Sequence, residues 1–95
     1  MAEKKVWFIT GCSTGLGRDL AEVLLEQGYR VVATARRLDS IEDLAERFPE
    51  NARIAKLDVT VPEQIAAAVA YAISEFGRID VLVNNAGYGL LGAIE

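Results

Sequence analysis

Three glycines and a serine stand close together near the start of the chain, in the segment Thr10–Gly17 (TGCSTGLG). Gly11, Gly15 and Gly17 follow an apolar run and precede a helical pattern. At such a junction, glycine allows a tight turn, a close backbone approach to a pyrophosphate, and close packing of the helix on a sheet. The first N–H groups of the helix and its dipole would then face the anion. The segment therefore predicts a phosphate-binding turn, with a plain glycine-rich turn as the alternative.

The same residues fit a second motif, G-x-S-x-G, because Gly11–Gly15 reads GCSTG. This motif is typical of the nucleophile elbow of α/β-hydrolases, in which Ser13 would be the nucleophile. The chain contains no histidine to act as the base, and an elbow does not require Gly17. A hydrolase is therefore the less favoured alternative. Cys12 is predicted to be a small packing residue, since no base is present to form its thiolate.

Two arginines, Arg36 and Arg37, follow the next apolar run. In dinucleotide-binding folds, an acid about 20 residues after the glycines holds the ribose hydroxyls of NAD. A guanidinium at this place can instead pair with a 2′-phosphate. The sequence therefore predicts NADP as the cofactor, with NAD less favoured and Arg36 as the main candidate. We expect Asp39 to belong to a helix start and Arg18 to be a solvated first-turn residue.

Four short apolar runs predict four strands, Val6–Thr10, Val31–Ala35, Ile54–Val59 and Ile79–Asn84. Segments of helical spacing separate these runs. This alternation predicts the α/β class, a Rossmann-like doubly wound parallel sheet with helices on both faces. The fourth strand would normally be buried between two neighbours, and no sequence remains here to supply one of them.

Two of the predicted helices carry clear apolar stripes. The stripe of the first helix comprises Leu16, Leu20, Val23 and Leu24. The stripe of the third comprises Ile65, Val69, Ile73 and Phe76.

The ends of these helices also carry signals. Ser40 with Asp43 and Thr60 with Glu63 have the spacing of capping boxes, which predicts a helix start at each pair. Gly77 is predicted to end the third helix.

Composition limits the classes of protein that fit. A chain of 95 residues with 52% hydrophobic residues predicts one compact domain. Its 10 basic and 14 acidic residues give a net charge of −4, which argues against nucleic acid as a partner. One cysteine and no histidine exclude a disulfide framework and an intrachain zinc site. A chain without a disulfide framework fits a reducing compartment, so we expect a cytoplasmic protein. The longest apolar run, Ile65–Ile73, is too short to span a membrane.

The chain resembles the classical short-chain dehydrogenase/reductase family in two motifs. TGCSTGLG is similar to the TGxxxGxG motif of that family, and Asn84–Gly87 (NNAG) is similar to its second fingerprint. Leu57–Thr60 (LDVT) resembles the end of its adenine-binding strand. The resemblance implies the strand order 3-2-1-4. It also implies that residues 1–95 form the N-terminal part of a single NAD(P)-binding Rossmann domain, without the catalytic C-terminal part.

Carried over to this sequence, the resemblance implies a set of cofactor-binding residues. The set comprises Gly11, Ser13, Thr14, Gly15, Leu16, Gly17, Arg36, Asp58, Val59, Asn84, Ala86 and Gly87. The three glycines and the Leu16 backbone would surround the pyrophosphate, and Ser13 would contact the adenosine ribose or phosphates. Thr14 would join Arg36 at the 2′-phosphate, although NADP-linked members often have a basic residue at the Thr14 position. Asp58 and Val59 would contact adenine, and the last three would lie near the adenosine ribose. Asn85 is expected to be a structural clamp.

The resemblance further implies hydride transfer between nicotinamide and a small carbonyl or alcohol substrate, in a parent protein that is a homo-oligomer. The family chemistry needs a tyrosine with a lysine four residues later. None of the three tyrosines, Tyr29, Tyr71 and Tyr88, has that lysine. We therefore assign no catalytic residue and no metal ligand, and we expect this chain alone to be inactive. A non-catalytic nucleotide-binding module is the alternative.

Overall fold

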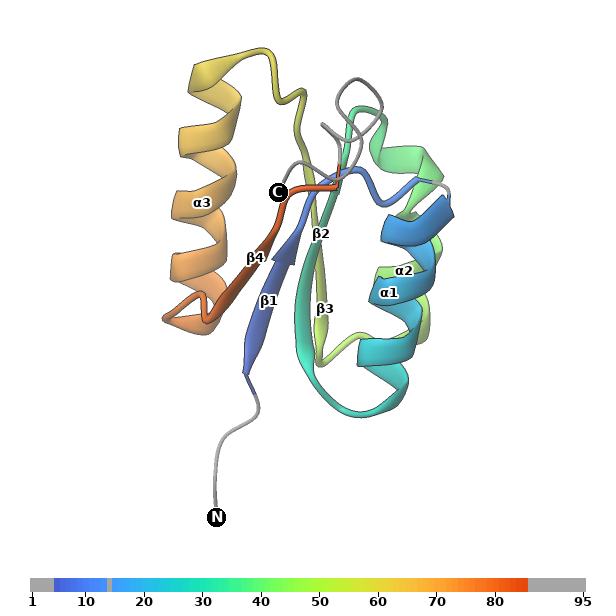
Figure 1. The fold of residues 1–95 in the computed structure, drawn as a ribbon. Helices are drawn as coiled ribbons and strands as arrows, with labels where there is room; N and C mark the ends of the chain where they lie inside the picture. Colours follow the sequence, from blue (N-terminus) through green and yellow to red (C-terminus); the bar gives the residue numbers. More distant parts are fainter. Residues whose placement is uncertain (1–4, 14, 86–95) are drawn as a thin grey trace.

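The computed structural model describes residues 5–13 and 15–85. Its strands form one parallel sheet in the order β3-β2-β1-β4, which confirms the predicted topology. The strands are β1 (Val6–Ile9), β2 (Arg30–Ala35), β3 (Ala52–Lys56) and β4 (Val81–Val83). Figure 1 shows the sheet between helices on either side, as expected for a doubly wound fold.

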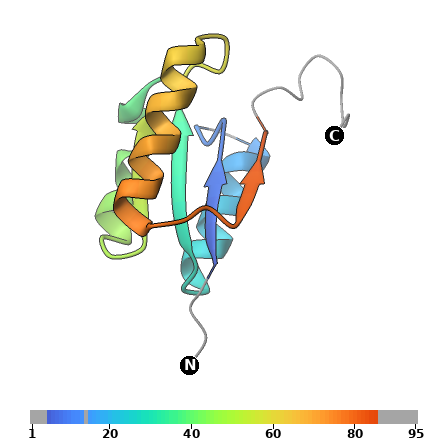
Figure 2. The same cartoon turned by 90° about the vertical axis from the view of Figure 1, so that its left-hand side faces the viewer.

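The helices pack on opposite faces of the sheet (Figures 1 and 2). One face is covered by α1 (Gly15–Glu26) and α2 (Glu42–Arg47), with the short 3-10 helix η1 (Leu38–Ser40) before α2. The other face is covered by α3 (Pro62–Phe76). Each face has its own buried cluster, because successive side chains of a strand point to opposite faces.

The third strand differs most from its predicted bounds, Ile54–Val59. Backbone pairing continues as far as Leu57, whose N–H donates to the Ala35 carbonyl at 2.9 Å. The chain then turns, since Asp58 Oδ1 accepts hydrogen bonds from the N–H and the hydroxyl of Thr60 at 3.0 and 2.6 Å. An aspartate that binds the backbone two residues later forms a turn in place of a strand.

Half of the predicted stripe of α1 faces the sheet, since Leu24 is buried and Leu20 packs against the cluster on that face. Leu16 is 73% exposed and Val23 is 48% exposed, although both were expected to face the sheet. The buried positions are Gly17, Ala21, Leu24 and Leu25. Small residues at the first two of these positions let the helix approach the sheet closely, and a pattern of large apolar residues does not show this.

The predicted stripe of α3 is also correct only in part. Ala68 and Ala72 are the buried residues of this helix. Ile65, Val69 and Ile73 are 36–43% exposed and lie beside the buried line. Only Phe76 of the predicted stripe packs against the cluster under α3.

Neither predicted capping box forms. Ser40 lies in η1 and its hydroxyl donates to the Arg37 carbonyl at 2.6 Å, while α2 begins two residues later, at Glu42, without a side-chain cap. Thr60 is engaged with Asp58, and Val61 precedes α3, again without a side-chain cap. Turn formation by the hydroxyl residues therefore competes with capping. Gly77 ends α3 as predicted, at φ +82°.

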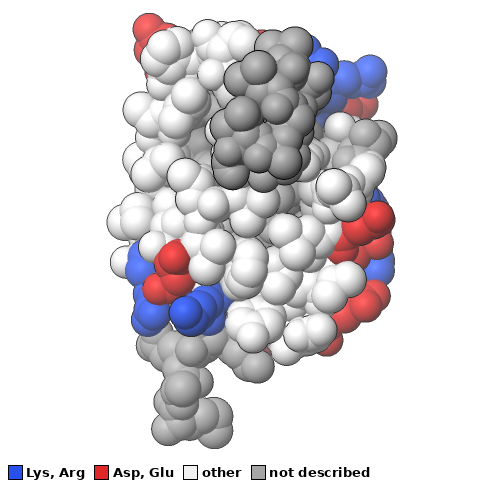
Figure 3. Space-filling model, viewed as in Figure 1, with Lys and Arg blue, Asp and Glu red and all other residues white. Residues whose placement is uncertain are grey.

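Strands β3 and β4 are the edges of the sheet among the described strands. Among the described strands, β4 pairs with β1 alone, and its Leu82 is 65% exposed. Charged side chains lie at the margins of the face in Figure 3, and a wide uncharged area lies between them. In the part of the chain that the structure describes, no helix is long and apolar enough to cross a membrane.

Asp80 joins the start of β4 to β1. Its Oδ2 accepts a hydrogen bond from the Val6 N–H at 2.8 Å, and its own N–H donates to the Val6 carbonyl at 2.9 Å. Arg78 donates to both carboxylate oxygens at 2.8–3.0 Å. These hydrogen bonds, first from Arg78 and then from Val6, hold the pKa of Asp80 below its ordinary value of 3.8.

We expect Asp80→Asn to lower the melting temperature at neutral pH. A carboxyl whose pKa is depressed on folding stabilises the fold above its unfolded pKa, and this contribution disappears as the pH falls through the folded pKa. The difference in melting temperature between the unsubstituted protein and the variant should therefore disappear in acid, as the pH drops below 3.8. Asp39→Asn, which removes an exposed ion pair within one loop, is the control and should change little. A pH-independent difference would contradict the assignment.

Candidate cofactor site

A cavity of about 750 Å³ opens where β1, β2 and β3 end. The lining residues come from the loops that follow these strands and from the segment after β4. They are Gly11, Ser13, Ala35, Arg36, Arg37, Asp39, Ser40, Leu57, Asp58, Val59, Thr60 and Asn85. Parallel α/β sheets bind ligands at the carboxyl ends of their strands, so this is the expected place for a site.

The structure brings five of the predicted site residues to this cavity, namely Gly11, Ser13, Arg36, Asp58 and Val59. Among the other described candidates, Gly15, Leu16, Gly17 and Asn84 do not line it. Thr14, Ala86 and Gly87 lie outside the described residues.

The glycine turn has the backbone that its sequence predicts. Gly11 and Gly15 have φ values of +69° and +66°, a region that other residues rarely adopt. Gly17 lies against this turn: a Cβ there would stand 2.3 Å from the Gly11 carbonyl oxygen and 2.7 Å from Asn85 Nδ2. Asn85 Nδ2 donates to the same carbonyl oxygen at 3.0 Å, so Asn85 clamps the turn as expected.

Cys12 lies inside the turn but faces the core. It is fully buried, its N–H donates to the Thr34 carbonyl at 2.8 Å, and its thiol donates to the Ile9 carbonyl at 3.4 Å. Burial raises the pKa of the thiol to about 11. The thiol is therefore protonated at neutral pH, and Cys12 is a packing residue as predicted.

The loop after β2 supplies the positive charge of the cavity. Arg37 pairs with Asp39 at 3.0 Å in an exposed contact. Among the described residues, the Arg36 side chain makes no hydrogen bond or ion pair. Asp39 lies in the first turn of η1, which confirms the expectation that it belongs to a helix start. Arg36 lines the cavity, and no described carboxylate forms an ion pair with its side chain.

Asp58 follows β3, lines the cavity and supplies a negatively charged group. Its N–H donates to Gln64 Oε1 at 2.8 Å, and its Oδ1 accepts the two hydrogen bonds from Thr60. These bonds from Thr60, with a smaller effect of the charge of Arg36, hold the pKa of Asp58 below its ordinary value. The carboxylate is therefore ionised at neutral pH and can accept a hydrogen bond from a ligand.

Asn84 lies at the end of β4 and not in the cavity. The Thr10 hydroxyl lies 3.3 Å from Asn84 Oδ1, and the Thr10 N–H donates to the Val83 carbonyl at 3.0 Å. Asn84 thus helps to align the ends of β1 and β4.

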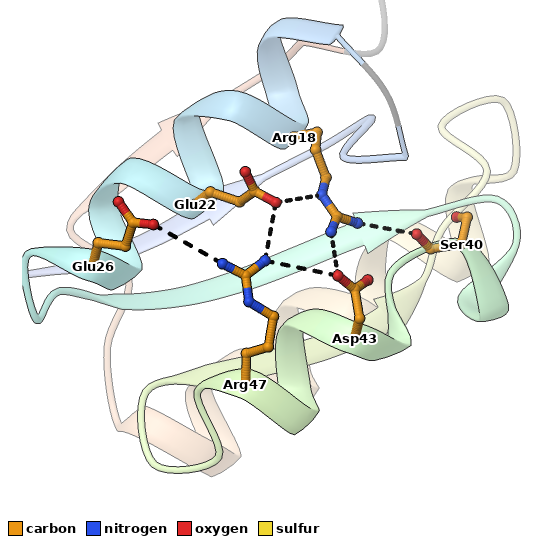
Figure 4. Close-up of polar contacts among 6 residues, drawn as sticks. All are labelled: Arg18, Glu22, Glu26, Ser40, Asp43 and Arg47. Carbon is orange, nitrogen blue, oxygen red and sulfur yellow. Dashed lines mark hydrogen bonds and ion pairs between the residues drawn. The ribbon is translucent and has the colours of Figure 1, made fainter.

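Arg18 is not the solvated residue that its position suggests. Its side chain is 20% exposed and contacts three groups: Glu22 at 3.0 Å, the Ser40 carbonyl at 3.2 Å, and Asp43 (Figure 4). Asp43, the expected capping residue of α2, faces Arg18 instead. Partners on another helix cannot be read from the local sequence, which explains why both expectations were wrong.

Several lining residues were missed by sequence reasoning. Thr60 had a local signal, because the order Asp-x-Thr favours a side-chain turn at the end of a strand. Ser40 and Asp39 had none, since their approach to the cavity depends on the fold of η1. Among the described residues, no group of three or more His, Cys, Asp or Glu is placed to hold a metal ion.

A parallel sheet of this order, with a glycine turn into α1 and a polar cavity at the strand ends, defines a nucleotide-binding α/β domain. The family model described as short chain dehydrogenase matches residues 5–95, and the chain belongs to that family. This membership removes the hydrolase alternative, and Ser13 is therefore not a nucleophile of that class.

Similar proteins support the same assignment. The chain is 46% identical over 92 residues to the oxidoreductase BOA17 of Botryotinia fuckeliana, covering 96% of this chain and 34% of that protein. A short-chain dehydrogenase from Streptomyces avermitilis matches with a TM-score of 0.83 and 43% identity, over 87% of this chain and 31% of that one. A 3-ketoacyl-(acyl-carrier-protein) reductase from Brucella melitensis, solved with NADH, matches with a TM-score of 0.78 and 32% identity, over 84% of this chain and 33% of that one. The chain thus spans about a third of the length of these relatives.

Proposed function

We propose that this chain is the cofactor-binding N-terminal part of an NADP(H)-dependent short-chain oxidoreductase. The proposed parent enzyme transfers hydride between nicotinamide and a carbonyl or alcohol carbon of a small molecule. The observation that carries the cofactor preference is Arg36, which lines the cavity at the end of β2, where NAD-binding folds have an acid. The family also supports a homo-oligomeric parent, for which we propose a cytoplasmic location.

The residues of the cavity fit the adenosine half of a dinucleotide. Its volume of about 750 Å³ is within the range of small-molecule sites. The positive φ of Gly11 opens the turn beside Ser13, and a Cβ on Gly15 would meet nothing within 4 Å, which leaves space for a pyrophosphate. In the proposed site, Arg36 and Thr14 hold the 2′-phosphate, and Asp58 with the Val59 N–H contacts adenine.

The remaining candidates have supporting roles in this proposal. Gly17 holds α1 against the turn, so that the N–H groups of Gly15 and Leu16 face the phosphates. Asn84, Ala86 and Gly87 border the adenosine ribose. The bound cofactor supplies the hydride, and the protein supplies binding and orientation.

The Brucella melitensis reductase was solved in complex with NADH, and this describes that protein alone. We favour NADP here because a 2′-phosphate beside Arg36 gains a charge-assisted contact, and the nearest acid of this loop, Asp39, is already paired with Arg37. The nicotinamide chemistry is the same for either cofactor.

We expect the 95-residue chain alone to consume no NADPH with any carbonyl compound, because no tyrosine in it has a lysine four residues later to form the proton donor. The proposed full-length parent, assayed on the same panel of ketones and aldehydes, should oxidise NADPH. Turnover by the chain alone would contradict this prediction. Binding of NADPH by the parent without turnover of any substrate would favour the non-catalytic module.

A further inference from the structure

The ion pairs between α1 and α2 include one contact that reaches the cavity wall. Arg18, in the first turn of α1, donates through Nη1 to the main-chain carbonyl of Ser40 at 3.2 Å. Ser40 lines the cavity, and Arg18 does not. The other contacts of Arg18 in the described structure are with Glu22 of the same helix and with Asp43 of α2, and neither partner lines the cavity (Figure 4).

The contact at Ser40 continues to Arg37, which directly follows Arg36 at the end of β2. The Ser40 hydroxyl donates to the Arg37 carbonyl at 2.6 Å, and its N–H donates to the same oxygen at 3.2 Å. The carbonyl of Ser40 is held by Arg18 and its two donors are held by Arg37. The backbone between them, which includes η1, is therefore fixed at both ends.

We propose that Arg18 is a positioning residue for recognition of the 2′-phosphate. It anchors the loop of Arg36, Arg37 and Ser40 to the same helix turn whose N–H groups face the pyrophosphate. This inference rests on the proposed NADP site. Arg18 acts through the loop and makes no contact with the cofactor, since its guanidinium is occupied by Glu22, Ser40 and Asp43.

The shape of the guanidinium is needed for this role. Three separate acceptors on α1, η1 and α2 surround it, and its nitrogens point to them in one plane. With the side chain only 20% exposed, competition from water is limited. A lysine ammonium at this position keeps the charge but cannot span all three acceptors.

Arg47 provides a matched control from the same cluster. It pairs with Glu22 at 3.1 Å, with Asp43 at 3.8 Å and with Glu26 at 3.9 Å. None of these partners lines the cavity. Removing Arg47 therefore weakens the link between the helices without touching the loop at Ser40.

The test uses the proposed full-length parent and two probes that differ only in the 2′-phosphate, adenosine 2′,5′-bisphosphate and adenosine 5′-phosphate. Binding is measured by calorimetry, after thermal melting has shown that each variant is folded. We expect Arg18→Met and Arg18→Lys to weaken binding of the bisphosphate about five-fold, and to change binding of the monophosphate less than about two-fold. Arg47→Met should leave the ratio of the two affinities unchanged.

Three results would overturn the inference: an unchanged ratio in folded Arg18→Lys, full recovery by lysine relative to methionine, or an equal effect of Arg47→Met. Arg36→Ala separates this inference from the proposed function. If Arg36→Ala lowers the ratio and the Arg18 variants do not, only the positioning role fails. If Arg36→Ala leaves the ratio unchanged as well, the NADP assignment itself fails.

Discussion

Gly17→Ala is expected to destabilise the fold by about 2 kcal/mol or more, although alanine is the better helix former. In an exposed helix interior, the same change would stabilise by about 1 kcal/mol. Here the added Cβ would stand 2.3 Å from the Gly11 carbonyl oxygen and 2.7 Å from Asn85 Nδ2, so the helix or the turn must move. Overpacking typically costs about 1–3 kcal/mol, and weakening the Asn85 hydrogen bond adds about 1 kcal/mol.

Thermal melting measures this effect. A loss of about 2 kcal/mol lowers the melting temperature of a domain of this size by about 8 °C or more. Gly77→Ala is the control, because Gly77 also lies at one end of a helix, but a Cβ there would meet nothing within 4 Å. Alanine at position 77 costs about 1–2 kcal/mol through its positive φ alone. Comparison of the two variants therefore separates backbone strain from close contact. A Gly17→Ala variant as stable as the parent would contradict the role of Gly17 in packing.

The predictable parts of the fold are those with strong local signals. The strands before Gly11 and before Arg36 were placed correctly, because each is a short apolar run that ends at a polar or glycine-rich segment. The parallel direction of the strands then follows from the alternation of strands and helices, whereas their order was implied by the family resemblance. The full buried faces of α1 and α3 were not predictable in this way, since they include Gly17, Ala21, Ala68 and Ala72, which are too small to form a visible stripe.

The site residues were predictable where a residue reaches the cavity through its position in the glycine turn or at a strand end. Gly11, Ser13 and Arg36 fall in this group. Arg18 was not predictable, because its partner Asp43 is 25 residues away in the chain and meets it only after both helices pack. Ser40 has the spacing of a capping residue, yet η1 directs its hydroxyl to the preceding turn. Tertiary contacts, and not residue type, decide these roles.

Arg36→Ala is expected to weaken binding of NADPH to the proposed parent about ten-fold or more and to leave binding of NADH nearly unchanged. A hydrogen bond to a charged group contributes about 1.5–3 kcal/mol, and each 1.4 kcal/mol is about a ten-fold change in affinity. Arg36 is exposed, so screening by salt favours the lower end of this range. The effect should therefore grow as the ionic strength is reduced.

Arg37→Ala is the matched control for this prediction, because it removes the same charge from the adjacent residue. Arg37 also lines the cavity, but its guanidinium pairs with Asp39 at 3.0 Å and is 79% exposed, so its loss should cost less. Fluorescence titration with NADPH and NADH gives the four affinities directly. Equal losses for the two cofactors in Arg36→Ala would refute the NADP assignment. Equal losses of NADPH affinity in the two variants would show that the net positive charge of the cavity, and not pairing with Arg36, favours binding of the 2′-phosphate.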